Sequence, residues 1–376
     1  MACGTTIRSC YGLGHMLKLL KRETDVESTD HVVIYPTFGH LTRDGSVWRI
    51  DVYGTVYEAS SINPRKRLLL RLLQRVAKVQ PNDAQRELFE SRIREFIAPT
   101  YPGKRVALRV GEQVYPLQKR TKRNGRFQGS VRLSTKELDE LHQTGDLADG
   151  LLRLDVLARD GEATQFNLNA HLLDHRGVSV ISDIDDTIKV TDVHSRRALL
   201  QNTFLREFET IDGMSGLYQR WAQQGAAFHY VSSSPWQLYA SLAEMCETKG
   251  FPCGSFHLRS FRLRDHMLRR LLLIRRKGKA AVIRNLLKTF PRRQFIFVGD
   301  SVEKDPEIYG RIARKYPHQV AAICIRQIDA RPIAGERLRK TFRDLPEQSV
   351  RLFECPSELP DDLGLLVSSD RVTRQA

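Results

Sequence analysis

The residues of this sequence best suited to chemistry are three carboxylates: Asp183, Asp185 and Asp186. The apolar residues around them predict a buried β-strand: Val178, Val180, Ile181 and Ile184. Alternation along an extended chain places Asp183 and Asp185 on one side, and open α/β sheets bind ligands beyond the carboxyl ends of strands. Two such carboxylates repel each other, so we expect a cation nearby. Mg²⁺ takes oxygen ligands and binds phosphate, so it is the expected cofactor; the alternative is a simple Asp-rich turn.

Three more features fall where strands are predicted to end or helices to begin. The serine run Ser232–Ser234 follows an apolar strand and Pro235 opens a helix, an arrangement that can bind phosphate at the helix N-terminus. Lys279 stands near the start of a later helix, and the strand after that helix runs into the acidic segment Gly299–Asp305. Singly, these features are typical of a helix cap, a solvent-facing lysine and a turn. In this order, on alternating strands and helices, they predict one site.

These residues need a scaffold of parallel strands, and the sequence after Gly177 predicts one. Helices and strands alternate there: helices at Gly213–Gln224, Trp236–Lys249, Lys279–Phe290 and Pro306–Tyr316, and strands at Ala227–Val231, Ser255–Leu258, Gln294–Val298 and Gln319–Ile325. This alternation is typical of an α/β fold with a parallel, doubly wound sheet and right-handed crossovers. The α/β domain is expected over residues 176–330, followed by a polar C-terminal extension over 331–376.

The first part of the chain predicts a different architecture. Residues 1–30 are expected to form a flexible leader, and residues 31–175 a β-rich N-terminal domain with a helical insertion. Its strands are predicted at residues 31–58, 105–110, 113–117, 126–133, 151–158 and 164–173. The insertion holds a second helix at Asn82–Ile97 and, before it, a basic amphipathic helix that begins near Pro64. That first helix is either an ordinary surface helix or a membrane-surface helix.

The four features of the α/β domain resemble the haloacid dehalogenase superfamily of phosphohydrolases: a D-x-D-x-T motif, a serine after the next strand, a later lysine and a terminal G-D-x-x-x-x-D. Longer motifs resemble the actin-patch-type phosphatidate phosphatase family: D-I-D-D-T-I-K-V-T-D-V, N-T-F, G-M-x-x-L-Y, Y-V-S-S-S-P-W-Q-L-Y and G-D-S-x-x-x-D-P-E-I-Y. The likeness covers about Gly177–Gln327, and the β-rich part is similar to the N-terminal region of bacterial-type members. Val302 departs from the glycine common at its position, and the segment before Lys279 is unusually arginine-rich.

The resemblance implies a Mg²⁺-dependent phosphatase that hydrolyses phosphatidate or a related lipid phosphate. Asp183 would be the nucleophile that forms an aspartyl-phosphate. Asp185 would protonate the leaving oxygen and then activate the water that hydrolyses the intermediate. The implied metal site comprises Asp183, the main-chain carbonyl of Asp185, Asp300 and, in an outer position, Asp305. Asp186 is interpreted as mainly structural.

The resemblance also implies which residues hold the substrate. Ser232, with Ser233 beside it, and Lys279 would bind the oxygens of the phosphoryl group being transferred. Asp305 would either orient Lys279 or support the metal. Lys277 is an alternative to Lys279 in this role, and we favour Lys279 because its pattern continues into the helix.

The charge of the chain indicates an acidic partner. It has 60 basic and 44 acidic residues, a net charge of +16, which suits an anionic membrane, a phosphorylated substrate or nucleic acid. The sequence has no zinc-finger or RNA-recognition motif, so nucleic acid is the least favoured partner. The competing functions are a phosphatase for soluble or nucleic-acid-end phosphoesters and a non-enzymatic adaptor at membrane or cytoskeleton. The complete set of acids argues against the adaptor, and the oligomeric state stays open.

The segment Leu258–Lys279 is the strongest candidate for membrane contact. It holds nine Lys and Arg residues against one acid, with apolar residues between them, and is either a solvated face or a surface for anionic lipid. Six cysteines in a chain of 376 residues do not indicate a disulfide framework, and the absence of a C-x-x-C pair argues against a zinc site. No stretch is long and apolar enough to predict a membrane span. We therefore expect a cytoplasmic protein with peripheral membrane contact.

Overall fold

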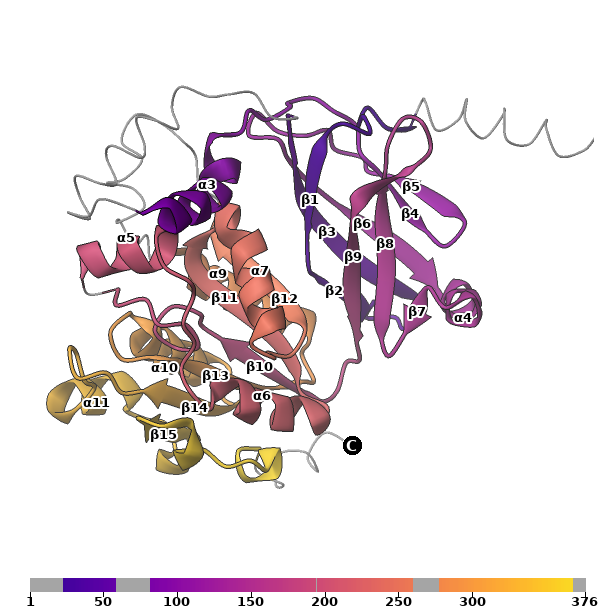
Figure 1. Ribbon diagram of the computed structural model, residues 1–376. Helices are drawn as coiled ribbons and strands as arrows, with labels where there is room; N and C mark the ends of the chain where they lie inside the picture. The colour runs from indigo at the N-terminus through magenta and orange to yellow at the C-terminus, as the bar shows by residue number, and fades with distance from the viewer. Residues whose placement is uncertain (1–22, 59–81, 194, 260–276, 368–376) are drawn as a thin grey trace, which may run out of the picture. The chain divides into compact units, whose positions relative to one another are not determined.

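The structure, a computed structural model, describes residues 23–58, 82–193, 195–259 and 277–367 (Figure 1). The chain divides into two compact units. The first comprises Met1–Ile62 and Ala98–Leu173, and the second comprises Asn63–Ile97 and Asp174–Ala376. The predicted basic helix near Pro64 and most of the arginine-rich segment lie outside the described residues.

The first unit is built on one mixed sheet. Its strands are β1 (His31–Tyr35), β2 (Phe38–Leu41), β3 (Val47–Tyr57), β4 (Ala107–Val110), β5 (Gln113–Pro116), β6 (Arg126–Ser134), β7 (Leu147–Ala148), β8 (Leu151–Leu157) and β9 (Ala163–Leu173). The order is β1-β3-β2-β9-β8-β4-β5, with β6 beside β3 and β7 beside β8, and among these pairs β2 and β9 run parallel. Alternating β-branched and aliphatic side chains pack into a buried core, which explains the strand pattern of this region. Its helix α4 (Thr135–Thr144) begins at a capping box between Ser134 and Glu137.

The helix α3 (Asp83–Ile97) belongs to the second unit, although its sequence lies between β3 and β4 of the first. The sequence analysis places this insertion in the β-rich domain, whereas in the structure α3 belongs to the second unit. The physical reason is the apolar face of α3: the rings of Phe89 and Phe96 lie 6.2 and 5.7 Å from that of Phe204. The buried Arg92 adds a hydrogen bond to the carbonyl of Thr203.

The α/β class predicted for the second unit is confirmed by a sheet whose paired strands all run parallel. Its order is β12-β11-β10-β13-β14-β15 (Figure 1). The strands are β10 (Val178–Ser182), β11 (Ala227–Pro235), β12 (Gly254–Arg259), β13 (Gln294–Asp300), β14 (Val320–Arg326) and β15 (Val350–Phe353). Besides α3, its helices are α5 (Arg196–Phe204), α6 (Met214–Gln223), α7 (Tyr239–Thr248), α9 (Lys277–Thr289), α10 (Asp305–Lys315) and α11 (Gly335–Phe342). Single 3₁₀ turns lie at Trp236–Leu238, Glu347–Ser349, Pro356–Glu358 and Leu363–Leu365.

The strand order reverses at β10, because the chain builds outward through β11 and β12 on one side and through β13, β14 and β15 on the other. Such reversal points are where open α/β sheets bind ligands. The carboxyl ends of β10 and β13 lie side by side, since Ser182 pairs with Val298. Asp183 and Asp300 therefore arrive at one edge of the sheet.

Two local features differ from the predicted elements. The helix expected from Trp236 begins as a 3₁₀ turn, and α7 starts at Tyr239, so the serine run stands on the end of β11. The expected C-terminal extension contributes α11 and the edge strand β15, which pairs with β14. Among the described residues, no helix combines the length and the apolar character needed to cross a membrane.

Candidate active site

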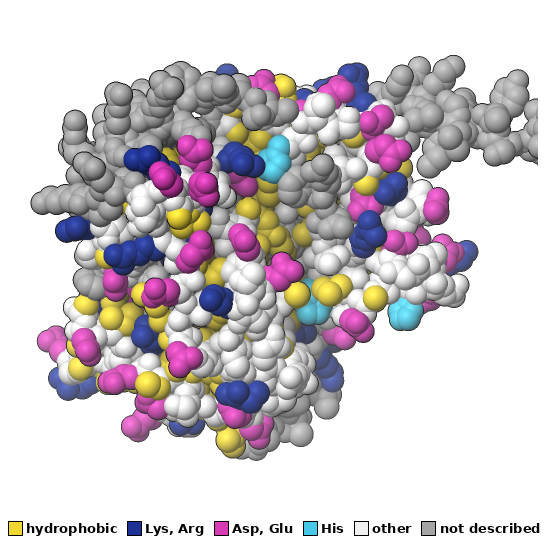
Figure 2. Space-filling model, in the orientation of Figure 1, with side chains coloured by type: hydrophobic (Ala, Val, Ile, Leu, Met, Phe, Trp, Pro, Cys, Tyr) yellow, Lys and Arg dark blue, Asp and Glu magenta, His cyan; other side chains and the backbone are white. Residues whose placement is uncertain are grey.

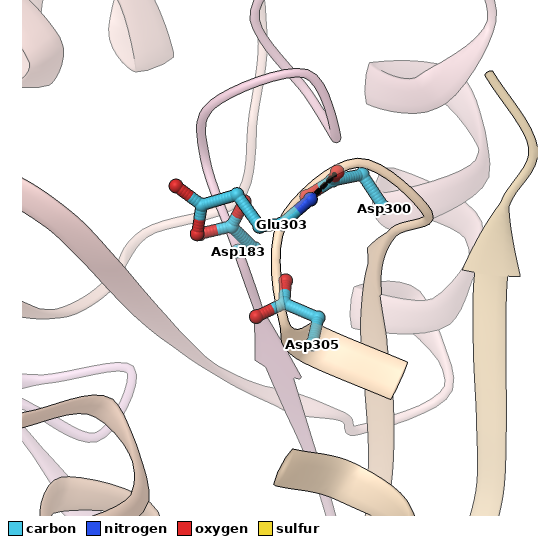
Figure 3. A group of neighbouring side chains, drawn as sticks. All are labelled: Asp183, Asp300, Glu303 and Asp305. Carbon is cyan, nitrogen blue, oxygen red and sulfur yellow. Dashed lines mark hydrogen bonds between the residues drawn. The ribbon is translucent and has the colours of Figure 1, made fainter. Parts of the chain in front are cut away.

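Four carboxylates gather at the carboxyl ends of β10 and β13: Asp183, Asp300, Glu303 and Asp305 (Figure 3). Each contributes one oxygen to a group in which all four oxygens lie within 4.8 Å of one another. Asp183 follows β10, Asp300 ends β13, Glu303 lies in the next turn and Asp305 opens α10. The structure thus brings together three of the predicted residues and adds Glu303, which the sequence interpretation left without a role.

Lys279 sits among these carboxylates and is itself almost fully buried. Its Nζ donates to Asp183 Oδ1 at 2.7 Å, to Asp305 Oδ1 at 2.5 Å and to Glu303 Oε2 at 3.3 Å. Of the two roles expected for Asp305, the contact observed is the one with Lys279. The alternative lysine, Lys277, begins α9, but its side chain lies outside the described residues.

The electrostatics of this cluster reflect a shortage of positive charge. Burial raises the pKa of Asp183 and of Asp300 well above the usual carboxyl range, and the neighbouring carboxylates raise both further. Burial likewise raises the pKa of Glu303 to about 7. Burial lowers the pKa of Lys279, but Asp183, Asp305 and Glu303 more than offset this and raise it well above its usual value. One ammonium does not balance the charge of four carboxylates, so a bound cation would reduce the net negative charge of the group.

The donor atoms fit a hard divalent cation. Asp300 Oδ1 is held by the backbone N–H groups of Val302 and Glu303, at 2.6 and 2.7 Å. Its other oxygen, Oδ2, and Oδ2 of Asp305 are buried without a hydrogen-bond partner among the described residues. An unpaired buried carboxylate oxygen is costly, and coordination to a cation removes that cost. A set made only of oxygen donors suits Mg²⁺.

The side chain of Asp185 lies outside the four-carboxylate group and has its own partners. Lys189 Nζ is 3.1 Å from Oδ1, and hydroxyl groups donate to the carboxylate from Thr191 at 2.9 Å, Ser232 at 2.9 Å and Ser234 at 2.7 Å. Burial raises the pKa of Asp185, but Lys189 and the three hydroxyls outweigh it and lower that pKa. The carboxyl group is therefore held in its ionised form.

The two serines predicted to bind the substrate have different surroundings. Ser232, expected at a phosphoryl oxygen, donates to Asp185 in this arrangement. Ser233 lines an open pocket next to Asp185. Sequence reasoning missed Lys189, Thr191 and Ser234, although all three stand inside quoted motifs.

Asp186 stabilises the loop after β10, which is the mainly structural role expected for it. Its carboxylate accepts hydrogen bonds from the backbone N–H groups of Thr191, Asp192 and Val193. Asp186 itself has φ 57°, a left-handed conformation that Asp adopts more readily than most residues. The following Thr187 Oγ1 donates to Asp183 Oδ2 at 3.3 Å, which helps to orient that carboxylate.

Two arginines after β14 hold the turn that carries Glu303. Arg337 Nη1 donates to the carbonyl of Ser301 at 2.8 Å, and Arg331 Nη1 donates to that of Val302 at 3.0 Å. Arg337 also pairs with Glu307 at 3.1 Å. Nothing in the sequence beyond their charge singles out these arginines, because they lie in the stretch expected to be a polar extension.

Comparison with known proteins identifies relatives of this region. Residues 178–327 match the family model described as "Phosphatidate phosphatase APP1, catalytic domain". Phosphatidate phosphatase APP1 of Saccharomyces cerevisiae is 37% identical over 155 residues, which cover 40% of this chain and 26% of that protein. An uncharacterized protein of Schizosaccharomyces pombe is 31% identical over 161 residues, covering 42% and 26%. The chain thus spans about a quarter of either relative, and the resemblance expected from the motifs is confirmed over residues 178–327.

One solved structure overlaps the chain loosely. It is D,D-heptose 1.7-bisphosphate phosphatase from B. bronchiseptica complexed with magnesium and phosphate, and it covers 53% of this chain and 99% of its own. The two share 15% sequence identity with a TM-score of 0.28.

Proposed function

We propose that this protein hydrolyses phosphatidate, or a related lipid phosphate, to the alcohol and inorganic phosphate, on the premise that residues 178–327 belong to the catalytic-domain family of phosphatidate phosphatase APP1. The observation that carries the proposal is the gathering of four carboxylates around Lys279 at the end of a parallel sheet. Such a site suits phosphoryl transfer, because a carboxylate nucleophile, a metal site and a fixed ammonium occupy one place. The strand order, which reverses at β10, supports a doubly wound, haloacid-dehalogenase-like arrangement.

The metal of this proposal is Mg²⁺. Asp183, Asp300, Glu303 and the main-chain carbonyl of Asp185 would hold it, with Asp305 behind them at Lys279. When bound it would neutralise the repulsion between a phosphate dianion and a carboxylate about 4 Å apart, which is ~1 kcal/mol in water and ~4 kcal/mol at an effective dielectric near 20.

The chain's own residues then carry the steps. Asp183 attacks phosphorus, the bond to the alcohol oxygen breaks, and an aspartyl-phosphate forms. Asp185 in its protonated form gives its proton to the departing alcohol. As the resulting carboxylate it takes a proton from the water that attacks phosphorus and breaks the bond to Asp183, so both proton transfers balance. Lys279 and Ser232 donate to the phosphoryl oxygens, with Ser233 beside them. In the substrate-free arrangement, the four donors around Asp185 stabilise its carboxylate, which is the form that acts as the base.

Contact with an anionic membrane forms part of the proposal. Its support is the net charge of +16, and we place the protein in the cytoplasm with peripheral membrane contact. On the face shown in Figure 2, basic side chains of the described residues are interspersed with acidic ones, so the excess charge is not gathered there. Two basic stretches are candidates for this contact. The predicted helix near Pro64 lies outside the described residues, and so does most of Leu258–Lys279.

A phosphate-release assay tests the proposed function. The panel contains phosphatidate in detergent micelles, lysophosphatidate, an alkyl phosphate and a 5′-phosphorylated oligonucleotide, each with Mg²⁺ and with EDTA. We expect release from the lipid phosphates with Mg²⁺, none with EDTA, and none from the Asp183→Asn variant. Preference for the oligonucleotide would favour a nucleic-acid-end phosphatase instead. Absence of release from every substrate would favour the adaptor.

A further inference from the structure

An open pocket lies beside Asp185 in the second unit, and the proposed steps at phosphorus do not use it. Its cavity volume is about 60 Å³, and the empty space around it, which includes open solvent, is about 570 Å³. One part of its lining, among the described residues, is polar: Asp185, Thr203, Ser233, Ser234, Arg259 and Glu303. The other part is apolar: Val193, Leu199, Leu200, Phe204, Pro235 and Leu238. The pocket therefore joins the carboxylate of Asp185 to a hydrophobic wall.

Helix α5 supplies half of the apolar lining residues, Leu199, Leu200 and Phe204, and α3 holds that helix in place. Phe204 is 2% exposed and is covered from behind by two rings of α3, those of Phe89 and Phe96. The guanidinium of Arg92 donates to two carbonyls at the end of α5, those of Thr203 and Arg206. A helix end bound in this way has its free carbonyls satisfied, so the wall is fixed before any ligand arrives.

Asn202 fixes the wall relative to the acid–base carboxylate. Its Nδ2 donates to the carbonyl of Thr191 at 3.2 Å, and the hydroxyl of Thr191 donates to Asp185 at 2.9 Å. The segment Asn202–Phe204, singled out in the sequence as N-T-F, thus has one residue that ties α5 to the catalytic loop and two that line the pocket.

We propose that this pocket binds the apolar part of the leaving alcohol next to the phosphoester. In phosphatidate this part is the glycerol backbone and the first carbons of an acyl chain. The inference rests on the proposed function, since it takes Asp185 as the group that protonates the alcohol oxygen. If that oxygen lies at Asp185, the carbons bonded to it lie in the pocket that Asp185 lines. Burial against Leu199, Leu200 and Phe204 stabilises methylene groups, whereas a sugar hydroxyl against these three side chains would lose its water without finding a hydrogen-bond partner among them.

Binding of alkylphosphonates tests this pocket without any chemistry. Ethyl-, butyl-, hexyl- and octylphosphonate are titrated calorimetrically into the Mg²⁺-loaded protein. We expect affinity to rise roughly fourfold for each methylene that is buried, until the pocket is full. In Leu199→Asn the affinity should increase less with each added methylene. In Leu199→Trp the affinity should stop increasing at a shorter alkyl chain. Leu199 is partly exposed, so both variants should fold. The matched control is Leu352→Asn, a partly exposed leucine of β15 that does not line the pocket.

The outcomes separate this inference from the proposed function. Equal affinity along the series in the wild type, or equal flattening in Leu352→Asn, would overturn the pocket assignment. Phosphate release from the matching alkyl phosphates is measured in parallel. If phosphate is released at rates that do not depend on the length of the alkyl chain, the phosphatase proposal stands and the assignment of the pocket is wrong. Graded binding without release of phosphate from any substrate supports the pocket as a site for alkyl phosphonates and overturns the phosphatase proposal.

Discussion

Lys279 Nζ lies 2.7 Å from Asp183 Oδ1, and both side chains are almost fully buried. Through the same ammonium, Asp183 is linked to Asp305 and Glu303, so one side chain of α9 connects the ends of β10 and β13. A lysine only donates hydrogen bonds, so it orients the carboxylates and favours their ionised forms where burial opposes them. The proposed nucleophile is thus held by a residue about a hundred positions later in the chain.

Replacing Asp183 by Asn tests the proposed nucleophile. The amide oxygen can still accept from Lys279, so the fold should persist while nearly all turnover is lost. Phosphate release and thermal melting are measured together. The matched control is Asp192→Asn, an exposed aspartate of the same loop with φ 56°, a conformation that Asn tolerates. Turnover retained by folded, metal-loaded Asp183→Asn would overturn the mechanism.

Replacing Asp185 by Asn separates acid–base chemistry from metal binding. Turnover should fall by ~10²-fold or more, while Mg²⁺ affinity stays close to that of the wild type because this carboxylate lies outside the four-carboxylate group. Stability should fall by ~3 kcal/mol, because the buried ammonium of Lys189 loses its counter-charge. Adding Lys189→Met should restore much of the stability and none of the turnover.

Chemical denaturation, calorimetry and phosphate release give the three readouts for Asp185→Asn. Collapse of Mg²⁺ affinity, with full rate restored at saturating metal, would make Asp185 a side-chain ligand and contradict the assignment. Unchanged stability would show that the pair with Lys189 contributes nothing.

The sequence predicted the residues at strand ends better than those placed by loops. Asp183 and Asp300 could be expected together, because both end apolar runs and parallel neighbouring strands bring such ends to one edge. Glu303 could not, because its position depends on the path of the turn that Asp300 holds through two backbone hydrogen bonds. Lys189 pairs with a residue four positions away, but along an irregular loop, where helical spacing rules do not apply.

The helix α3 shows a second limit of sequence reasoning. Its periodic apolar residues predicted a helix at almost the observed bounds. Periodicity predicts which face of a helix is buried, but it does not predict which part of the protein covers that face. A helix inserted in the sequence of one unit can therefore pack in the other unit. The contacts of Phe89 and Phe96 with Phe204, together with the hydrogen bonds of Arg92, show that α3 supports the pocket wall.

Replacing Glu303 by Gln tests the residue that the structure added to the site. We expect Mg²⁺ affinity to fall by ~10-fold, because one carboxylate near the metal is lost while the turn keeps its shape. Calorimetric titration of Mg²⁺ gives the affinity. The control is Glu336→Gln, an exposed glutamate of α11 outside the cluster. Equal affinity in wild type and Glu303→Gln would leave Glu303 as a partner of Lys279 alone.

Arg337 gives the last prediction, which concerns positioning and not chemistry. Its guanidinium donates to the carbonyl of Ser301 and pairs with Glu307, so it fixes the turn between Asp300 and Asp305 from outside the site. In Arg337→Gln the turn should loosen, and the Mg²⁺ concentration needed for half-maximal rate should rise by ~3- to 10-fold, which corresponds to about 1 kcal/mol, the net contribution of a typical hydrogen bond. The rate at saturating Mg²⁺ should change little, because no reacting atom is touched.

The matched control for this prediction is Glu307→Gln. It removes the ion pair of Arg337 but leaves the backbone hydrogen bond to Ser301, so the requirement for Mg²⁺ should rise less than in Arg337→Gln. Phosphate release measured across a Mg²⁺ titration separates the two effects. If Arg337→Gln lowers the saturated rate and leaves the metal requirement unchanged, then Arg337 acts on the chemical step and the positioning argument fails. If both variants shift the metal requirement equally, the ion pair and not the carbonyl contact holds the turn.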